Sequence, residues 1–475
     1  MITKKILSLV ILLFLTSACA TFKNDHEQRD ERLDQILNSA FFKSAQIGLS
    51  VYDLTSGTQI TSRNEELLLR PASNEKILTT GAALLFLGNG YNFKTSLYHS
   101  GAFHDSVISG DLFVKGGLDP DFSSRDLDSL VKEIRSAGVK EITGNLYADV
   151  SAMDSLFFGE GWMWDDDPAS YSPYLSPLCI NKNCVRAAYS PSGTGEPSKI
   201  ELIPSSGFFS IQNSSVTVDT GKSDLSVTRN WMSRGNTILV EGRINKNDKS
   251  DTVSINVFNP ALYFLTLLKE ELQKNGIRFT GATGIKKMPE KVFDLCSVVR
   301  NINEVIFNTN KKSDNLNAEM ILRSLATVSN KTASAQNGIV FIDSLISLSG
   351  LNPKNYRIAD GSGLSNYNLL SPKLIIETLK YFHKNERDKF DLLVKSFPLS
   401  GTDGTLANRM TDPLLRGKVH GKTGSISGVS NLSGIIESRN NHLVAFSIMI
   451  QNFTQSASNA RSIQDEICKI IFETN

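Results

Sequence analysis

The 475-residue sequence is poor in several features that would each indicate a class of protein. Its five cysteines are too few for a scaffold built on disulfides. Its 50 Lys and Arg nearly balance its 49 Asp and Glu, so no overall field attracts nucleic acid. Six histidines and the lack of a Gly-x-Ser-x-Gly elbow disfavour a Ser-His-Asp hydrolase. With no internal repeat, a chain of this length is expected to form two or three ordinary globular domains.

The N-terminus predicts export. The apolar run from Ile6 to Leu15 follows two lysines and precedes small residues, which is the pattern of a secretory signal. At about ten residues this run is too short to span a bilayer. Cleavage after Ala20 fits an ordinary signal peptidase (signal 1–20). Alternatively, residues 15–19 resemble a bacterial lipoprotein box, which gives signal 1–18 and a lipidated Cys19. Either cleavage predicts a periplasmic protein, linked to a membrane only through a lipid on Cys19.

Export permits a disulfide between Cys179 and Cys184, which lie five residues apart. The alternative is a pair of buried thiols on neighbouring strand ends, and the sequence leaves both open. Cys296 and Cys468 are interpreted as core cysteines.

Hydrophobic periodicity divides the chain into three stretches. Near the N-terminus, a polar tether (20–32) leads into a helical pattern (27–45) and a hairpin (46–63). Residues 91–300 alternate short β-like runs with turns, interrupted by helices over 126–137 and 260–274. After residue 301 the pattern is helical until two β-like runs, 428–436 and 442–450, and a final helix, 456–472.

This order of patterns predicts a split α/β domain of the α+β type. The early hairpin is expected to pair with the two late strands in an antiparallel sheet with helices packed on it. The domain would comprise residues 19–90 and 301–475, single in space but divided in sequence. Residues 91–300 would form an inserted β-rich module, or two nested modules.

A serine followed by a lysine stands where a loop turns into an apolar helix. Ser73 and Lys76 are three residues apart, so they share one face of the helix. A lysine shielded from water can lose its proton near neutral pH and act as a base for a serine nucleophile. Alone, the pattern is weak, because an N-cap serine followed by a solvated lysine looks the same.

Two further motifs change that interpretation. Ser313-Asp314-Asn315 precedes a helical pattern, and Lys422-Thr423-Gly424 opens the strand-like run that continues to residue 436. Each motif alone also fits an ordinary structural role, as a helix-capping group or as a turn before a strand. In this order, however, the three motifs are the set typical of penicillin-binding proteins and serine β-lactamases.

The spacing of the motifs narrows the resemblance. Ser313 follows Ser73 by 240 residues, and the intervening stretch is β-rich. The chain therefore resembles the penicillin-binding protein 4 type of D-alanyl-D-alanine carboxypeptidase/endopeptidase, peptidase family S13, over essentially its whole mature length. Other family-like stretches are 258–262, 360–365 and 401–406, whereas 116–120 departs from the family pattern. The resemblance implies a β-lactamase/transpeptidase-like catalytic domain that acts on peptidoglycan stem peptides and cross-links and is acylated by β-lactams.

The resemblance also implies catalytic roles. Ser73 would attack the carbonyl of the penultimate D-alanine, Lys76 would act as the base, and Ser313 would relay a proton to the leaving amine. Backbone N–H groups of Ser73 and Ser425 would form the oxyanion hole.

Four residues are expected to bind substrate. Asn315 would hydrogen-bond the substrate amide, and the hydroxyls of Thr423 and Ser425 would bind the terminal carboxylate. Lys422 would add positive charge for that carboxylate and lower the pKa of Lys76 by repulsion between like charges. No cofactor or metal is expected.

Several other residues have ordinary interpretations. His420 is expected in a solvated loop. Residues 119–121 and 165–167 are acidic but do not fit a calcium loop, so we expect them to be solvated. Trp162 and Trp164 are expected to anchor a core or an interface, although they suit stacking on a sugar too.

Three functions follow in order of preference: a DD-carboxypeptidase and endopeptidase, a β-lactamase-like or esterase variant, and a non-catalytic protein that binds the cell wall. An intact set of motifs argues against the third. Rapid turnover of nitrocefin would distinguish the second.

Overall fold

The computed structural model describes residues 25–475 of the chain. The predicted signal peptide and the predicted lipidation site Cys19 lie outside these residues. Within residues 25–475, no helix has the length and apolar character needed to cross a membrane. The same residues contain no group of three or more His, Cys, Asp and Glu side chains placed to hold a metal.

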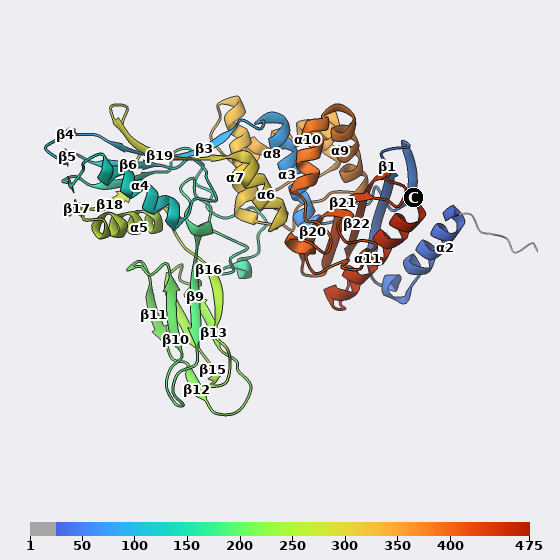
Figure 1. Ribbon diagram of the computed structural model, residues 1–475, viewed down its shortest axis with the longest axis horizontal. Coiled ribbons are helices and arrows are strands. Elements are labelled where there is room, and N and C mark those ends of the chain that lie inside the picture. The colour runs from blue at the N-terminus through green and yellow to red at the C-terminus, as the bar shows by residue number, and fades with distance from the viewer. Residues whose placement is uncertain (1–24) are drawn as a thin grey trace, which may run out of the picture.

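One antiparallel sheet joins the two ends of the chain (Figure 1). Its central contact is the pairing of the first strand with the last, from Gln46 opposite Gln451 to Asp53 opposite Val444. The strand order is β2-β1-β22-β21-β20, with β1 Gln46–Asp53, β2 Thr58–Arg63, β20 Val419–Ile426, β21 Val429–Glu437 and β22 Leu443–Gln451. The predicted pairing of the hairpin with the two late strands is confirmed. The Lys-Thr-Gly motif, however, lies on its own edge strand, β20, and not at the start of β21.

Helices cover both faces of this sheet. On one face α11 packs on β21 and α2, and on the other α9 packs on β22 and β1. Along β22 successive side chains alternate between the faces: Val444, Phe446 and Ile448 join the core under α11, whereas Ala445 joins the core on the α9 side. The helices of this region are α2 Asp25–Leu37, α3 Lys76–Phe86, α6 Ile302–Lys311, α7 Asn315–Leu325, α8 Ala335–Leu348, α9 Pro372–Asn385, α10 Arg387–Ser396 and α11 Ala457–Thr474.

The predicted polar tether over residues 20–32 is wrong from Asp25 onward, where α2 begins. The reason lies in tertiary packing. Leu33 and Leu37 of α2 are buried against the core formed with α11. Arg32 forms an ion pair of 2.7 Å with Glu473, so a segment with weak helical patterning is held as a helix by the end of the chain.

The stretch between α3 and α6 begins and ends on one antiparallel ribbon, in which Asn92 of β3 lies opposite Asn301 of β19. It builds a sheet in the order β18-β8-β6-β3-β19 and a second one in the order β17-β7-β5-β4, with α4 and α5 packed nearby. The elements are β3 Asn92–His99, β4 Ala102–His104, β5 Val107–Ser109, β6 Leu112–Lys115, α4 Ser124–Ser136, β7 Glu141–Ile142, β8 Leu146–Asp149, α5 Pro260–Lys274, β17 Arg278–Phe279, β18 Thr283–Ile285 and β19 Phe293–Asn301.

A second β-rich body projects from the first, drawn in green in Figure 1. Its strands form three small sheets, β10-β9-β16, β11-β14-β13 and β12-β15. They are β9 Cys184–Ser190, β10 Lys199–Ile203, β11 Ser210–Asn213, β12 Val216–Val218, β13 Ser226–Arg229, β14 Thr237–Glu241, β15 Arg243–Asn245 and β16 Asp251–Asn256. The domain boundaries at residues 90 and 301 stay predictions.

Cys179 and Cys184 do not form the disulfide that the sequence left open; both are free, as are Cys296 and Cys468. The thiol of Cys179 donates to the carbonyl of Ser176 at 3.0 Å, whereas that of Cys184 faces the carbonyl of Ser170. The two thiols therefore point to different partners. Burial raises the pKa of both to about 12, so they are inert thiols in the core.

Candidate active site

The loop before α3 is held by the neighbouring sheet. A short 3-10 helix, Ala72–Glu75, runs directly into α3, and Ala72 has a positive φ of 45°. The side chain of Asn431 on β21 donates to the carbonyl oxygen of Pro71 at 2.7 Å, and Asn74 donates to Ser433 at 2.6 Å. A strained residue directly before Ser73 persists because these contacts over-determine the loop.

Lys76 lies at the centre of the site and is fully buried. Its Nζ lies 2.9 Å from Ser73 Oγ, 2.6 Å from Asn315 Oδ1 and 2.6 Å from the carbonyl oxygen of Ser362. Burial lowers its pKa from 10.5 to about 8, and the nearby carboxylate of Asp360 opposes the shift. A minor part of Lys76, roughly a fifth, is therefore neutral near physiological pH, in contact with the hydroxyl that it is predicted to activate.

Ser313 precedes α7 and has a positive φ of 57°. Its neighbour Asp314 caps that helix by accepting from the N–H of Asn317 at 2.9 Å. Across the cavity, Lys422 Nζ donates to Ser313 Oγ at 2.8 Å and to its neighbouring Thr423 carbonyl at 2.8 Å. The structure thus joins the second and third motifs through one hydrogen bond.

The electrostatic role predicted for Lys422 needs correction. Lys422 is also fully buried, and its pKa lies well below the usual value because of burial and then repulsion by Lys76. The like-charge effect therefore acts on Lys422, whereas burial is the main cause of the shift at Lys76. A buried amine favours its neutral form, which weakens the idea that Lys422 supplies a permanent positive charge.

Four of the predicted site residues border one cavity of about 1000 Å³, whereas Lys76 and Lys422 are buried behind its wall. Its walls include Ser73, Ser313, Asn315 and Ser425. Thr423 lies two residues before Ser425 on β20, and its hydroxyl pairs with that of Thr405 at 2.7 Å. The other lining residues were not predicted: Arg70, Met163, Asp165, Asp166, Tyr171, Gly363, Leu364, Asn366, Ile426 and Ser427.

Sequence reasoning missed the loop around Asp360 that supports Lys76. Asp360 is buried and accepts from the N–H groups of Gly363 at 2.8 Å and Ser365 at 2.7 Å. The indole of Trp162 donates to the same carboxylate at 2.9 Å, so the interpretation of Trp162 as a core anchor is confirmed. These bonds fix the carbonyl of Ser362 that faces Lys76. The resemblance of residues 360–365 to the family was the available signal.

Gly363 shows why that loop needs glycine. Its φ is +80°, and a Cβ there would lie 1.8 Å from the carbonyl oxygen of Ala72. Any other side chain would push the loop away from the segment that carries Ser73.

Another buried carboxyl, Glu75, lies between Ser73 and Lys76 in the sequence. Within the described part of the chain, neither of its carboxyl oxygens has a hydrogen-bond partner. Burial, together with the charges of Asp360 and Glu319, raises its pKa well above the usual value, while Lys76 opposes the shift. The side chain is thus held in its neutral form.

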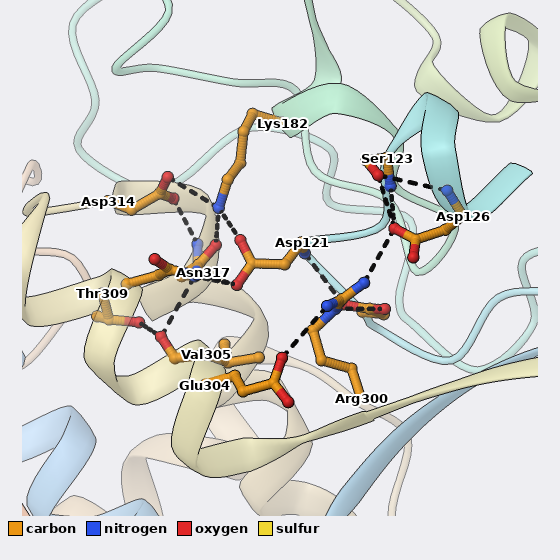
Figure 2. A network of polar contacts seen from close by, with 12 residues as sticks. Asp121, Ser123, Asp126, Lys182, Arg300, Glu304, Val305, Thr309, Asp314 and Asn317 are labelled. Carbon is orange, nitrogen blue, oxygen red and sulfur yellow. Dashed lines mark hydrogen bonds and ion pairs between the residues drawn. The ribbon is translucent and has the colours of Figure 1, made fainter.

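A polar network joins the inserted region to the second motif, as Figure 2 shows. Lys182 forms ion pairs with Asp121 and with Asp314, the latter at 3.0 Å, and it donates to the side chain of Asn317. Burial is the largest effect on Lys182, yet its pKa is raised because these carboxylates surround it. The residue next to Ser313 is therefore held from outside the split domain.

The predicted solvation of residues 119–121 is wrong, because the same network buries them. Arg300 contacts Asp119 at 3.0 Å. It also contacts Asp126 at 3.0 Å, as Figure 2 shows. Burial raises the pKa of Asp119 to about 6, against the attraction of Arg300. In the other acidic stretch, Asp167 is buried against Arg229, whereas Asp165 and Asp166 line the cavity.

His420 does not lie in a solvated loop as predicted, because it belongs to strand β20. Burial lowers its pKa, and its Nδ1 has no partner among the described residues. It stands two residues before Lys422 but has no contact with the hydroxyls of Ser73 or Ser313.

Comparison with known proteins identifies the protein family. The model of the D-Ala-D-Ala carboxypeptidase 3 (S13) family matches residues 29–473. The chain belongs to this family. It is 30% identical over 454 residues to a D-alanyl-D-alanine carboxypeptidase of Actinomadura sp. (strain R39), covering 92% of this chain and 83% of the relative.

Solved structures agree with this family. The structure superposes on the crystal structure of penicillin binding protein 4 (dacB) from Haemophilus influenzae with a TM-score of 0.83 and 28% identity, covering 93% of this chain and 99% of that one. A complex of the Haemophilus protein with a β-lactam gives a TM-score of 0.77 at 26% identity, covering 93% and 99%. The predicted family, the penicillin-binding-protein fold class and the assignment as a serine-type peptidase are confirmed.

Proposed function

We propose that the protein is a D-alanyl-D-alanine carboxypeptidase and endopeptidase that forms an acyl-enzyme on Ser73. The observation that carries the proposal is the contact of 2.9 Å between Lys76 Nζ and Ser73 Oγ, with the pKa of Lys76 lowered to about 8. A serine needs a neutral base within hydrogen-bond reach to become a nucleophile near neutral pH. Membership of the S13 family supports a peptide substrate that ends in D-alanine.

Acylation would use the first two motifs together. Neutral Lys76 takes the proton of Ser73 as its Oγ attacks the carbonyl of the penultimate D-alanine. Backbone N–H groups of Ser73 and Ser425 stabilise the oxyanion, a contribution of about 3–4 kcal/mol for one donor in comparable enzymes. Ser313, held at 2.8 Å by Lys422, then passes a proton to the leaving amine. The proton that Lys76 took from Ser73 replaces the one that Ser313 gives up, with neutral Lys422 as the carrier to Ser313, so both hydroxyl protons are accounted for.

Substrate positioning would fall to the neighbouring polar groups. Asn315 Oδ1 faces Lys76 while its Nδ2 donates to the carbonyl of Tyr171 at 2.7 Å, so its orientation is fixed before substrate binds. The hydroxyls of Thr423 and Ser425 would bind the terminal carboxylate. Such preorganisation spares the entropy that flexible side chains lose on binding.

Water then hydrolyses the acyl-enzyme, and β-lactams would acylate Ser73 and leave slowly. The substrates would be peptidoglycan stem peptides and, for the endopeptidase reaction, their cross-links. This function requires the exported, periplasmic location that the N-terminus predicts, with Cys19 as the site of a lipid anchor if the lipoprotein cleavage is used.

A Ser73→Ala variant tests the assignment directly. It should lose both covalent labelling by a fluorescent penicillin and release of D-alanine from a pentapeptide stem. Undiminished labelling of Ser73→Ala would show that Ser73 is not the nucleophile. Mass spectrometry of muropeptides then separates the activities: loss of D-alanine from pentapeptides reports the carboxypeptidase, and conversion of dimers to monomers reports the endopeptidase. Rapid turnover of nitrocefin with neither product would support the β-lactamase-like alternative instead.

A further inference from the structure

Two tryptophans from different parts of the inserted region pack against each other in a tilted arrangement near the proposed catalytic cavity. Trp164 belongs to the loop after β8, and Trp231 to the turn between β13 and β14. Their rings lie 5.3 Å apart with an interplanar angle of 31°. Trp164 is 66% exposed, and the neighbouring Met232 is 73% exposed. Large apolar side chains that gather in water mark a binding surface more often than single exposed ones do.

The exposed surface of Trp164 and Trp231 lines a cavity of about 420 Å³, and Arg234 lines the same cavity. The guanidinium of Arg234 lies over the ring of Phe157, 5.6 Å from its centroid. Within residues 25–475, Arg234 has no ion-pair partner in the structure. The site therefore offers two indole faces and a set of free hydrogen-bond donors. That combination suits an uncharged ligand with apolar faces and carbonyl oxygens.

The position of Trp164 ties this surface to the active site. Its sequence neighbours Met163 and Asp165 both line the cavity that contains Ser73. Trp164 itself lines the adjacent cavity with Trp231. One short loop thus forms a wall of the catalytic cavity on one side and the aromatic surface on the other.

We propose that Trp164 and Trp231 form a saccharide-binding platform for the glycan strand that carries the stem peptide. The inference rests on the proposed function, since it assumes a peptidoglycan substrate. A pentapeptide in extended form spans about 17 Å, so the sugar lies well away from the scissile bond. A sugar site is therefore expected beyond the wall of the catalytic cavity and not beside Ser73. The platform lies beyond that wall.

The chemistry of an N-acetylated sugar matches the platform. The C–H groups on the face of a pyranose ring form an apolar surface with slight positive charge, which stacks on the electron-rich face of an indole. The N-acetyl carbonyl is an acceptor that Arg234 can serve. The platform would thus favour stem peptides attached to glycan over free peptides.

The first test compares two substrates on the full-length protein: a disaccharide-pentapeptide and the same pentapeptide without sugar. Trp164→Ala and Trp231→Ala should each raise KM for the disaccharide-pentapeptide about tenfold, equivalent to about 1.4 kcal/mol, with little change on the sugar-free peptide. Trp164→Phe keeps an aromatic face and should recover most of the loss. The matched control is Phe103→Ala, which removes an exposed aromatic ring on β4, distant in Figure 1, and should leave both substrates unaffected.

An equal loss on both substrates would show that the tryptophans merely position the catalytic loop, and no loss on either would show that they do not bind sugar. Both results overturn the proposal. A second measurement does not depend on catalysis. Peptide-free glycan chains should change the tryptophan fluorescence of Ser73→Ala, but not of Ser73→Ala combined with Trp164→Ala. This titration keeps the two proposals separate, because a peptidase that fails to release D-alanine can still bind glycan.

Discussion

The surroundings of Ser73 and the inserted region bury charged groups in different ways. Next to Ser73, Lys76, Lys422 and Glu75 are fully buried with few or no oppositely charged partners in contact. In the inserted region, buried charges such as Arg229 and Asp167 are matched in ion pairs. Unmatched buried charges are costly and shift pKa values, whereas matched ones hold the structure together. The difference distinguishes the proposed catalytic residues from the buried charges of the inserted region.

The largest expected effect is the loss of the buried amine next to Ser73. Lys76→Met keeps the length and apolar stem of the side chain but removes the base, so acylation by a fluorescent penicillin should slow by about 10²–10⁴-fold. The control is Lys132→Met, which removes an exposed lysine paired with Asp128. Rates for Lys76→Met close to wild type would show that Lys76 is not the base.

The pH dependence of acylation tests the same amine in the unmodified protein. The pKa of Lys76 is about 8, and only its neutral form can accept a proton from Ser73. The second-order acylation rate should therefore rise about tenfold per pH unit below pH 8 and level off above it. A rate that stays flat over about two units below pH 8 would assign the base to a group with a lower pKa than Lys76.

Lys182 connects the two regions. Its loss should affect catalysis only by displacing the groups that react. Lys182→Met leaves Asp121 and Asp314 without their shared cation, so the segment carrying Ser313 should shift. We expect acylation to slow about tenfold, because small displacements of reacting groups raise the activation free energy.

The readout for Lys182→Met is kcat against KM on a D-alanine peptide, with a fall mainly in kcat. Lys132→Met again serves as the control, since it breaks an exposed ion pair in the inserted region. If both variants behaved alike, the contact of Lys182 with Asp314 would have no special role in the site.

The smallest expected effect concerns stability. Glu75 keeps its proton in the folded protein because its pKa is raised, but in the unfolded chain it ionises near its usual value of 4.5. Its contribution to stability is therefore complete below about pH 4.5 and is lost as pH rises toward the folded pKa. Glu75→Gln is neutral in both states, so the variant should gain stability over wild type as pH increases. Urea unfolding at several pH values measures this, and a pH-independent difference would contradict the burial of a protonated carboxyl.

Local sequence patterns were sufficient to predict several helices and strands. Spacing of apolar residues identified the first hairpin, α5 and α11 to within a few residues, because the periods of 2 and 3.6 are set by the backbone. The three motifs were recognisable for a similar reason, since each combines residue type with a local turn or helix start. The helical pattern over residues 27–45 indicated α2, but the tether assigned to residues 20–32 was wrong from Asp25 onward, where the helix packs against α11.

Four of the residues named from the sequence border one cavity, but the loop around Asp360 and the burial of Lys422 were not predicted. Burial depends on which segments fold over a side chain, and those segments are far apart in sequence. The same limit explains the acidic stretch 119–121, which is buried only because Arg300 and Lys182 face it.

By itself, the sequence determined the chemical groups available and the family, through motifs whose residues must stand together to react. Only the tertiary structure decided which amine is buried beside Ser73, that Cys179 and Cys184 stay free, and that Trp164 meets Trp231 near the cavity. The physical reason is that reactivity follows from residue type and short spacing, whereas pKa, pairing and access follow from solvent exclusion. Solvent exclusion is a property of the whole fold.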